Sequence, residues 1–174
     1  MKKIALVAIA FIAFSCSTDE ELERTPPLSV LAVAKATPNL SLFVRALEIT
    51  DLSATFDQSG NYTVFVPDNA AFLDLLSTLG EPNLEALDET LLSNVLKYHV
   101  LTTRVLSTDL SNGVSPATLF GQNITVNIDT TADEVTITDG NTLTSDATVI
   151  ARDINCSNGV IHRIDAVMLP NLGN

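Results

Sequence analysis

The hydrophobic pattern of this chain changes from a helical period in its first half to a strand period in its second half. Leu40, Phe43, Val44 and Leu47 recur at the i, i+3, i+4, i+7 spacing of an amphipathic helix. After Val105 the chain consists of short runs rich in Val, Ile and Thr, separated by Gly, Asn and Asp turns. Helices followed by strands, with no internal repeat, predict an α+β fold.

Residues 28–55 read as helices. Leu28, Leu31 and Ala32 fit one face of a short helix that Ser29 can cap. The sequence then restarts a helical pattern, for which Asn39 is a candidate N-cap.

A strand and two further helices follow. Residues 62–67 are apolar or aromatic on both faces, which is typical of a buried, central strand. Asp68 or Asn69 can then cap a helix by accepting hydrogen bonds from its exposed N–H groups. Residues 88–101 predict a helix that runs into a strand. The apolar faces of these two helices consist of Phe72, Leu75, Leu76 and Leu79, and of Leu91, Leu92, Val95 and Leu96.

The second half predicts a series of strands. Residues 123–129 and 133–140 alternate apolar with polar side chains, as half-buried hairpin strands do. Residues 117–122 and 147–154 have the same β-rich composition between turn residues. The last strand is expected over residues 159–169.

This last strand carries charged residues, which suit either an active site or the signature of a fold. Alternation places His162 on one face with Val160, Ile164, Ala166 and Met168. A histidine on an apolar face is usually a core residue with hydrogen-bonded ring nitrogens, and a ligand or catalytic role is the alternative. On the other face, Arg163 and Asp165 are two residues apart and could pair with each other or with neighbours.

The first 16 residues have the pattern of a secretory signal peptide. Two lysines precede an apolar run of 11 residues, which is too short to span a bilayer as a helix. The Cys16 that follows resembles the lipidated cysteine of a bacterial lipobox, in the looser form found in Bacteroidetes. We expect diacylation of Cys16, with an ordinary signal peptide or an uncleaved anchor as the alternatives. Residues 17–27 read as an acidic, flexible tether, and residues 171–174 as a tail.

Charge and cysteine content exclude several classes. Loss of Lys2 and Lys3 with the signal peptide would leave 7 basic against 21 acidic residues, a net charge of −14. Such a charge argues against nucleic acid or anionic lipid as a partner of the domain itself. If Cys16 is lipidated, Cys156 has no intrachain partner. A disulfide scaffold and a cysteine-based metal cluster are therefore excluded, and Cys156 is interpreted as a buried, inert thiol.

Familiar catalytic motifs are absent. The sequence has no G-x-S-x-G elbow, no phosphate-binding loop and no H-E-x-x-H, and its two histidines are 63 positions apart. The acidic stretch 129–141 lacks the spacing of a calcium loop. We therefore expect no catalytic residue, metal or cofactor. A carboxylate pair like that of glycosidases is the alternative, because acidic residues are plentiful.

Three segments resemble the fasciclin domain family in order and spacing: GNYTVFVPDNAAF (60–72), VLKYHVL (95–101) and NGVIHRIDAVMLP (158–170). The resemblance covers residues 28–170 and implies a single domain, an α+β β-wedge or sandwich packed against several helices. Asp68 stands where the family more often has Thr, and either residue can cap a helix. The residues that carry the signature are Val64, Phe65, Pro67, Asp68, Asn69, Phe72, Asn158, Gly159, His162, Asp165 and Pro170.

The resemblance implies adhesion rather than catalysis, with an extracellular protein or polysaccharide as ligand. In animal members of the family the Tyr-His segment is linked to integrin recognition. That link points here to Tyr98 and His99, flanked by Leu96, Val100 and Leu101, with a structural role as the alternative. Together with the lipobox, it predicts an exported module, anchored by lipid to the outer membrane and exposed at the cell surface. The alternative is an accessory lipoprotein that assists an outer-membrane complex.

Overall fold

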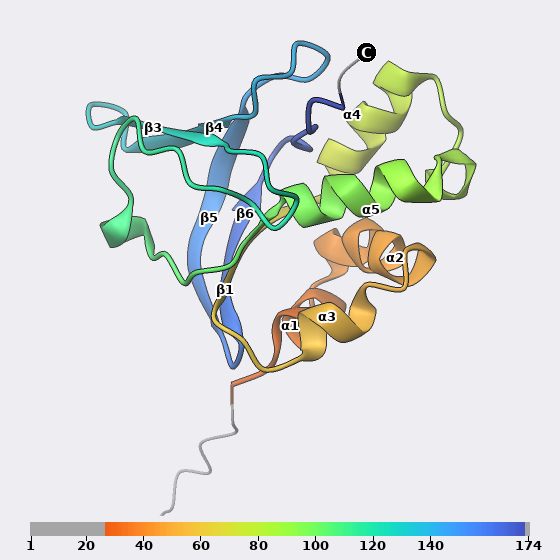
Figure 1. The fold of residues 1–174 in the computed structure, drawn as a ribbon, viewed down its shortest axis with the longest axis horizontal. Helices are drawn as coiled ribbons and strands as arrows, with labels where there is room; N and C mark the ends of the chain where they lie inside the picture. The colour runs from red at the N-terminus through yellow and green to blue at the C-terminus, as the bar shows by residue number, and fades with distance from the viewer. Residues whose placement is uncertain (1–26, 173–174) are drawn as a thin grey trace, which may run out of the picture.

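The computed structural model describes residues 27–172; Cys16, the rest of the expected signal peptide, nearly all of the tether and the last two residues lie outside this range. A six-stranded mixed sheet packs against helices, which confirms the α+β prediction (Figure 1). The helices are α1 (Val30–Ala36), α2 (Ser41–Ile49), α3 (Ser53–Asp57), α4 (Asn69–Leu79) and α5 (Glu89–Tyr98), with short 3₁₀ turns at Pro38–Leu40, Leu84–Ala86 and Ser107–Asp109. The strands are β1 (Tyr62–Pro67), β2 (Val100–Leu101), β3 (Thr125–Asp129), β4 (Glu134–Thr138), β5 (Ala147–Cys156) and β6 (Gly159–Ile164).

Strands from the two ends of the domain meet in the middle of the sheet. The strand order is β2-β1-β6-β5-β4-β3, and the β1–β6 pair is parallel whereas the others are antiparallel. Val64 lies opposite Ile161, and Phe65 opposite His162. Five of the six residues of β1 are buried, so the predicted burial of both its faces is confirmed.

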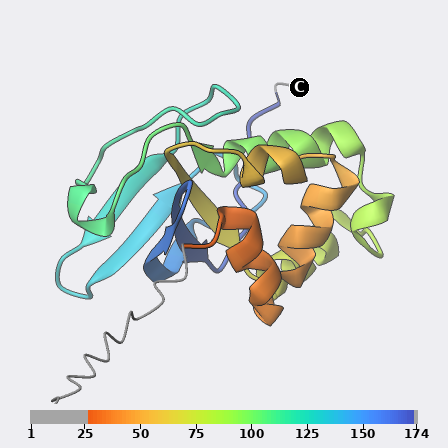
Figure 2. The same cartoon turned by 90° about the horizontal axis from the view of Figure 1, so that it is seen from below.

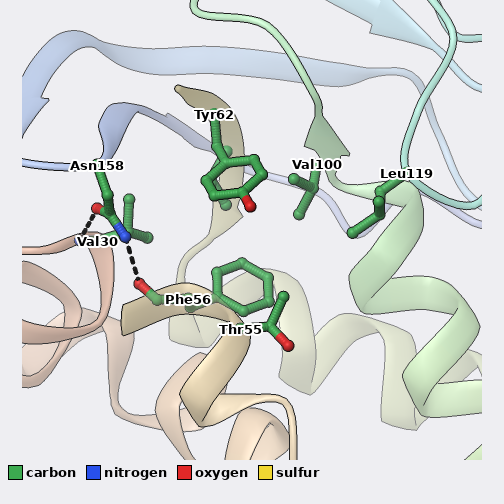
Figure 3. A pocket seen from close by; sticks show the side chains of 8 residues that line it. Val30, Thr55, Phe56, Tyr62, Val100, Leu119 and Asn158 are labelled. Atoms are coloured by element: carbon green, nitrogen blue, oxygen red, sulfur yellow. Dashed lines mark hydrogen bonds between the residues drawn. The ribbon is translucent and has the colours of Figure 1, made fainter. Parts of the chain in front are cut away.

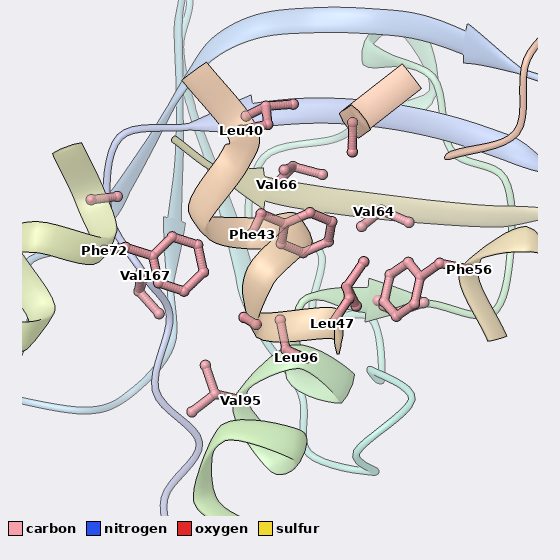
Figure 4. Close-up of a cluster of buried hydrophobic side chains, with 14 of the residues drawn as sticks. Leu40, Phe43, Leu47, Phe56, Val64, Val66, Phe72, Val95, Leu96 and Val167 are labelled. Atoms are coloured by element: carbon pink, nitrogen blue, oxygen red, sulfur yellow. The ribbon is translucent and has the colours of Figure 1, made fainter. Parts of the chain in front are cut away.

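Two hydrophobic cores lie on opposite faces of β1 and β6. The helices cover one face (Figure 2), where Val64, Val66 and Ile161 pack with Phe43 and Phe72 (Figure 4). The other face packs against the curled continuation of the sheet. Its buried side chains include Phe65, Tyr98, Leu101, Ile124, Val126, Ile137, Ile164 and Met168. Alternation along β6 therefore divides its side chains between the two cores, as the pattern predicts.

Side-chain caps fix the starts of the helices. Ser29 accepts a hydrogen bond from Ala32 N at 3.2 Å, and Asp68 accepts one from Ala71 N at 3.0 Å, so both of these predicted caps are confirmed. The prediction for Asn39 is wrong, because this residue lies in a 3₁₀ turn. Asn69, at the start of α4, instead accepts a hydrogen bond from Leu42 N at 3.0 Å. A cap supplied across 27 residues cannot be recognised from local sequence.

The segment 112–123 covers both edges of the sheet. Val126 N and O bond with Val114 and Gly113 beside β3, and Leu119 N donates to Val100 O beside β2. This pairing shields edges that could otherwise bind another strand. The predicted strand over 117–122 is wrong: the segment forms only isolated bridges, because Thr118 pairs back to Gln122 around Gly121, whose φ is +96°.

The last strand is shorter than predicted: β6 ends at Ile164, and not at residue 169. Beyond Asp165, whose N–H still reaches Thr148 O, backbone N–H groups are bound by side chains from distant elements. The Asp165 carboxylate accepts from Thr148 N at 2.6 Å, which agrees with pairing to a neighbour, and no ion pair between Asp165 and Arg163 is found among the described residues. The placement of Leu28 on a face of the first helix is also wrong, because α1 begins at Val30 and 53% of Leu28 is exposed.

Within the described range, no single helix has the length and apolar character needed to cross a membrane. One joined pair, α1 with Pro38–Ile49, passes that test only across a bend of 115°.

Candidate functional site

His162 is fully buried, and both of its ring nitrogens are hydrogen-bonded. Nε2 donates to Val105 O at 2.9 Å, and Nδ1 accepts from Asp153 N at 3.3 Å. The ring stacks on Phe65 with centroids 5.6 Å apart. Burial lowers the pKa of His162, which keeps the ring neutral at physiological pH.

A serine, an aspartate and this histidine come together without forming a catalytic pair. The Asp153 carboxylate accepts from Ser107 N at 2.8 Å and from the Ser107 hydroxyl. His162, however, contacts only backbone groups through its nitrogens, so no ring nitrogen can take the proton of Ser107. These hydrogen bonds connect β5 to the 3₁₀ turn that begins at Ser107. Asp153, in β5, adopts a positive φ of 58°.

Tyr98 and His99 are both buried, at 0% and 1% exposure. The Tyr98 hydroxyl donates toward Asn123 O at 3.0 Å and Asp139 O at 2.9 Å. Burial, and secondarily the Asp139 carboxylate, raises the pKa of Tyr98 to about 12. His99 Nδ1 donates to Val95 O at 2.7 Å, while Nε2 accepts from Met168 N at 3.1 Å.

Leu96, Val100 and Leu101, which flank this pair, are also at most 3% exposed. In this structure none of the five residues presents its side chain to a ligand. Their positions agree with the structural role that was the alternative at these sites. Direct ligand binding by the Tyr-His segment stays a prediction.

His99 helps to hold the C-terminal segment, residues 165–172. It supplies one of three side-chain hydrogen bonds to the backbone of this segment, which we call the clamp. Besides Met168 N on His99, Leu169 N donates to Asp139 Oδ2 at 2.7 Å, and Asn171 N donates to Gln122 Oε1 at 2.9 Å. Residues from three separate elements thus replace a strand partner for this segment. No local pattern in the sequence identifies these partners.

Asn158 links the β5–β6 turn to the helices, beside a small hollow (Figure 3). Its Oδ1 accepts from Val30 N at 2.8 Å, and its Nδ2 donates to Phe56 O and Gln58 O, each at 2.9 Å. The hollow beside it, lined by Tyr62, Val100 and Leu119 among others, has a free volume of about 10 Å³. That is room for about one water molecule, so it is not a ligand site.

A larger groove lies at the other end of the molecule. We call it the C-terminal groove; its free volume is about 310 Å³, within the range of known ligand sites. It is lined by Leu79, Leu91, Asn141, Leu143, Leu169, Pro170, Asn171 and Leu172. Figure 1 shows the β4–β5 loop, the C-terminal segment and α4 together at this end. His99 and Asp139 hold the backbone of the C-terminal segment, which forms one wall of this groove.

Cys156 is 5% exposed, and burial raises the pKa of its thiol to about 11. We predict that, in residues 17–174, which lack Cys16, this thiol reacts with iodoacetamide about 100-fold more slowly at pH 8 than a free cysteine, because so little thiolate is present. Alkylation followed by mass spectrometry, with the urea-unfolded protein as control, measures the ratio. Equal rates for folded and unfolded protein would contradict an inert thiol.

Among residues 27–172, no three His, Cys, Asp or Glu side chains are grouped so that they could hold a metal ion.

Comparison of the sequence with known protein families and proteins shows which family this chain belongs to. The model of the family described as the fasciclin domain matches residues 38–170. The chain belongs to the fasciclin domain family. Protein sll1483 of Synechocystis is 32% identical over 143 residues, which are 82% of this chain and 74% of that protein.

Two much longer animal proteins are also similar to this chain. The transforming growth factor-beta-induced protein ig-h3 of Sus scrofa is 33% identical over 84% of this chain, and human periostin is 30% identical over 82%. The chain spans only 20% and 16% of those two proteins. The solved FAS1 domain pair of the insect cell adhesion molecule Fasciclin I matches with a TM-score of 0.66 over 83% of this chain and 51% of that one. Its 19% identity shows a shared fold.

The signature residues of this fasciclin domain lie where its two ends meet. Val64, Phe65 and Pro67 are buried in β1, and Phe72 is a buried residue of α4. Gly159 has no room for a side chain: a Cβ there would lie 2.3 Å from the backbone oxygen of Tyr62 on the parallel strand. Pro170 is buried in the C-terminal segment, whereas Asp165 is exposed.

Proposed function

We propose that this fasciclin domain is an exported, non-enzymatic adhesion module that binds an extracellular protein or polysaccharide. The observation that carries the proposal is its membership of a family whose domains occur in cell-adhesion and extracellular matrix proteins. The acidic charge of the chain, −12, makes nucleic acid an unsuitable partner.

Catalysis receives no support from the titratable groups of the core. Both ring nitrogens of His99 and of His162 are hydrogen-bonded to backbone groups, and the raised pKa of Cys156 keeps it as a thiol. General acid–base and nucleophilic mechanisms need such groups free to meet a substrate. Binding without turnover fits these observations better.

The N-terminal region supplies the rest of the proposal. Lipidation of Cys16 would anchor the protein to the outer membrane, and the acidic tether 17–27 would hold the domain away from the surface. About 11 residues reach at most ~36 Å when fully extended. Mass spectrometry of the membrane fraction tests this part, since a diacylated N-terminal Cys16 is expected there and an unmodified cysteine would refute it.

Binding is tested with residues 17–174, which keep every described residue, on arrays of extracellular matrix proteins and glycans. We expect saturable binding to at least one component, with no change in the component itself. A folded His99→Gln variant on the same arrays addresses the Tyr-His segment. Full binding by this variant would place the contact surface elsewhere. If the wild-type protein binds nothing, the adhesion proposal fails and an accessory role in a membrane complex becomes the better explanation.

A further inference from the structure

The C-terminal groove exposes several apolar side chains to solvent, which is unfavourable for a domain without a binding partner. Leu143 and Leu172, two of its lining residues, are 62% and 50% exposed. Leu79 and Leu91 at its floor are only partly buried against the helix-side core. Exposed leucines that gather around one hollow are typical of a surface that another molecule covers.

An acidic hollow adjoins this groove on the other side of Leu143. It has a free volume of about 130 Å³ and is lined by residues of α4, of the β4–β5 loop and of the C-terminal segment. Asp74 and Asp165 contribute carboxylates, and Thr78, Thr144 and Ser145 contribute hydroxyls. No basic residue lines either hollow. The combined surface therefore offers an apolar slot next to negative charge.

Resting on the proposed function, we propose that the C-terminal groove binds an extended segment of a partner protein that carries a branched aliphatic side chain next to a lysine or arginine. The aliphatic side chain would cover Leu143 and Leu172, and the basic group would meet Asp74 and Asp165. Such a segment matches both the apolar lining and the charge of the site.

The negative charge of the chain favours this basic segment over a second copy of the chain or an anionic lipid surface. A second copy would bring another net charge of −12 against the same acidic surface, which is unfavourable. An anionic lipid surface would be repelled for the same reason. A neutral glycan would leave the leucines poorly covered, because the groove has no aromatic side chain among its lining residues.

The clamp prepares the groove for binding. Leu169 and Asn171 line it, and their backbone N–H groups are fixed by Asp139 and Gln122. Asp139 also accepts from Asn141 N at 2.8 Å, which ties the β4–β5 loop to the same carboxylate. A wall that is already ordered loses little conformational entropy when a ligand binds. His99 acts one residue away from this wall, because it holds Met168 N, which precedes the lining residue Leu169.

The test uses peptides of about 12 residues, selected from a displayed random library on residues 17–174 and then labelled with fluorescein. We expect selected sequences to combine aliphatic and basic residues. Leu143→Asp should weaken their binding in fluorescence anisotropy by about tenfold or more, since burial of one aliphatic side chain is lost. Leu73→Asp is the matched control: Leu73 is 58% exposed on α4 and lines neither hollow, so affinity should stay within about twofold.

Charge is tested separately. Asp74→Asn should weaken binding and reduce its dependence on salt, whereas Glu134→Gln, exposed on β4 away from both hollows, should do neither. Equal peptide binding by the wild-type and Leu143→Asp proteins would contradict the proposal that the groove is the binding site. Selection of peptides without basic residues would also contradict it. Failure to select any peptide while a matrix component binds would also overturn the groove and leave the adhesion function intact. Failure of both peptides and arrays would remove the proposed function itself.

Discussion

Replacing Asn158 with alanine is expected to lower the free energy of unfolding by about 3–5 kcal/mol. This side chain is 2% exposed and satisfies three backbone groups: Val30 N, Phe56 O and Gln58 O. Alanine removes the side-chain partner of all three. The contacts of Val30 N and Phe56 O are buried, and an unsatisfied buried group costs about 1–3 kcal/mol, whereas Gln58 O belongs to an exposed residue. The variant also removes the side-chain links from the β5–β6 turn to the start of α1 and the end of α3. Urea unfolding followed by far-ultraviolet circular dichroism measures the loss, since the chain has no tryptophan.

Two further variants separate the role of Asn158 from a general effect of the substitution. Asn155→Ala removes an exposed side chain that accepts a hydrogen bond from the Arg104 side chain at 2.5 Å, and should cost less than about 1 kcal/mol. Asn158→Asp keeps an acceptor for Val30 N but brings a carboxylate against two carbonyl oxygens. It should therefore be less stable at pH 7 than at a pH where that carboxyl is protonated. A cost below about 1 kcal/mol for Asn158→Ala would show that the turn does not hold the helices.

The predictable parts of the fold are those that local patterns encode. The caps at Ser29 and Asp68, the buried strand β1 and the alternating strands β3 and β4 all follow from short-range rules. Strand pairing across the chain does not. The β1–β6 pair joins residues about a hundred positions apart, and only the resemblance to a family indicated that these segments belong together.

The errors share one physical cause, which is that a side chain from a distant element replaces a backbone partner. Asn69 caps α2 in place of Asn39, and His99 and Asp139 bind the N–H groups that a longer β6 would have paired. An N–H group is satisfied equally well by a side-chain acceptor, so composition alone cannot distinguish a strand from a clamped segment.

The candidate site also combines residues that the sequence identifies with residues that only the folded structure brings together. The sequence singled out Tyr98 and His99, and in the structure both are buried and neither lines the groove. The groove itself is made by Leu79, Leu91, Leu143 and the C-terminal segment, which alternation and helical period treat as ordinary apolar residues. Their partial exposure is a property of the assembled fold, and only the coordinates reveal it.

His99 should make the stability of the protein depend on pH. Burial lowers its pKa from 6.5 to about 4, so the folded state keeps the ring neutral while the unfolded chain takes up a proton below pH 6.5. Stability is therefore fully present above about pH 6.5 and falls as the pH drops toward 4. One pKa unit corresponds to about 1.4 kcal/mol, so the total loss is about 3 kcal/mol, of which about 2 kcal/mol occurs between pH 7 and pH 5. Protonation would set an N–H on Nε2 against Met168 N–H, which breaks one point of the clamp.

The His99→Gln variant isolates this contribution. Glutamine retains one donor and one acceptor but does not titrate, so its unfolding free energy should fall by about 2 kcal/mol less than that of the wild type between pH 7 and pH 5. His162, whose pKa is also lowered by burial, acts in the same direction as His99, and Asp139, whose pKa burial raises, acts in the opposite one. Both remain in the variant, so the difference between the two curves belongs to His99. Parallel curves would mean that the ring can accept a proton without leaving Met168, and that the clamp at the C-terminal segment does not depend on a neutral imidazole.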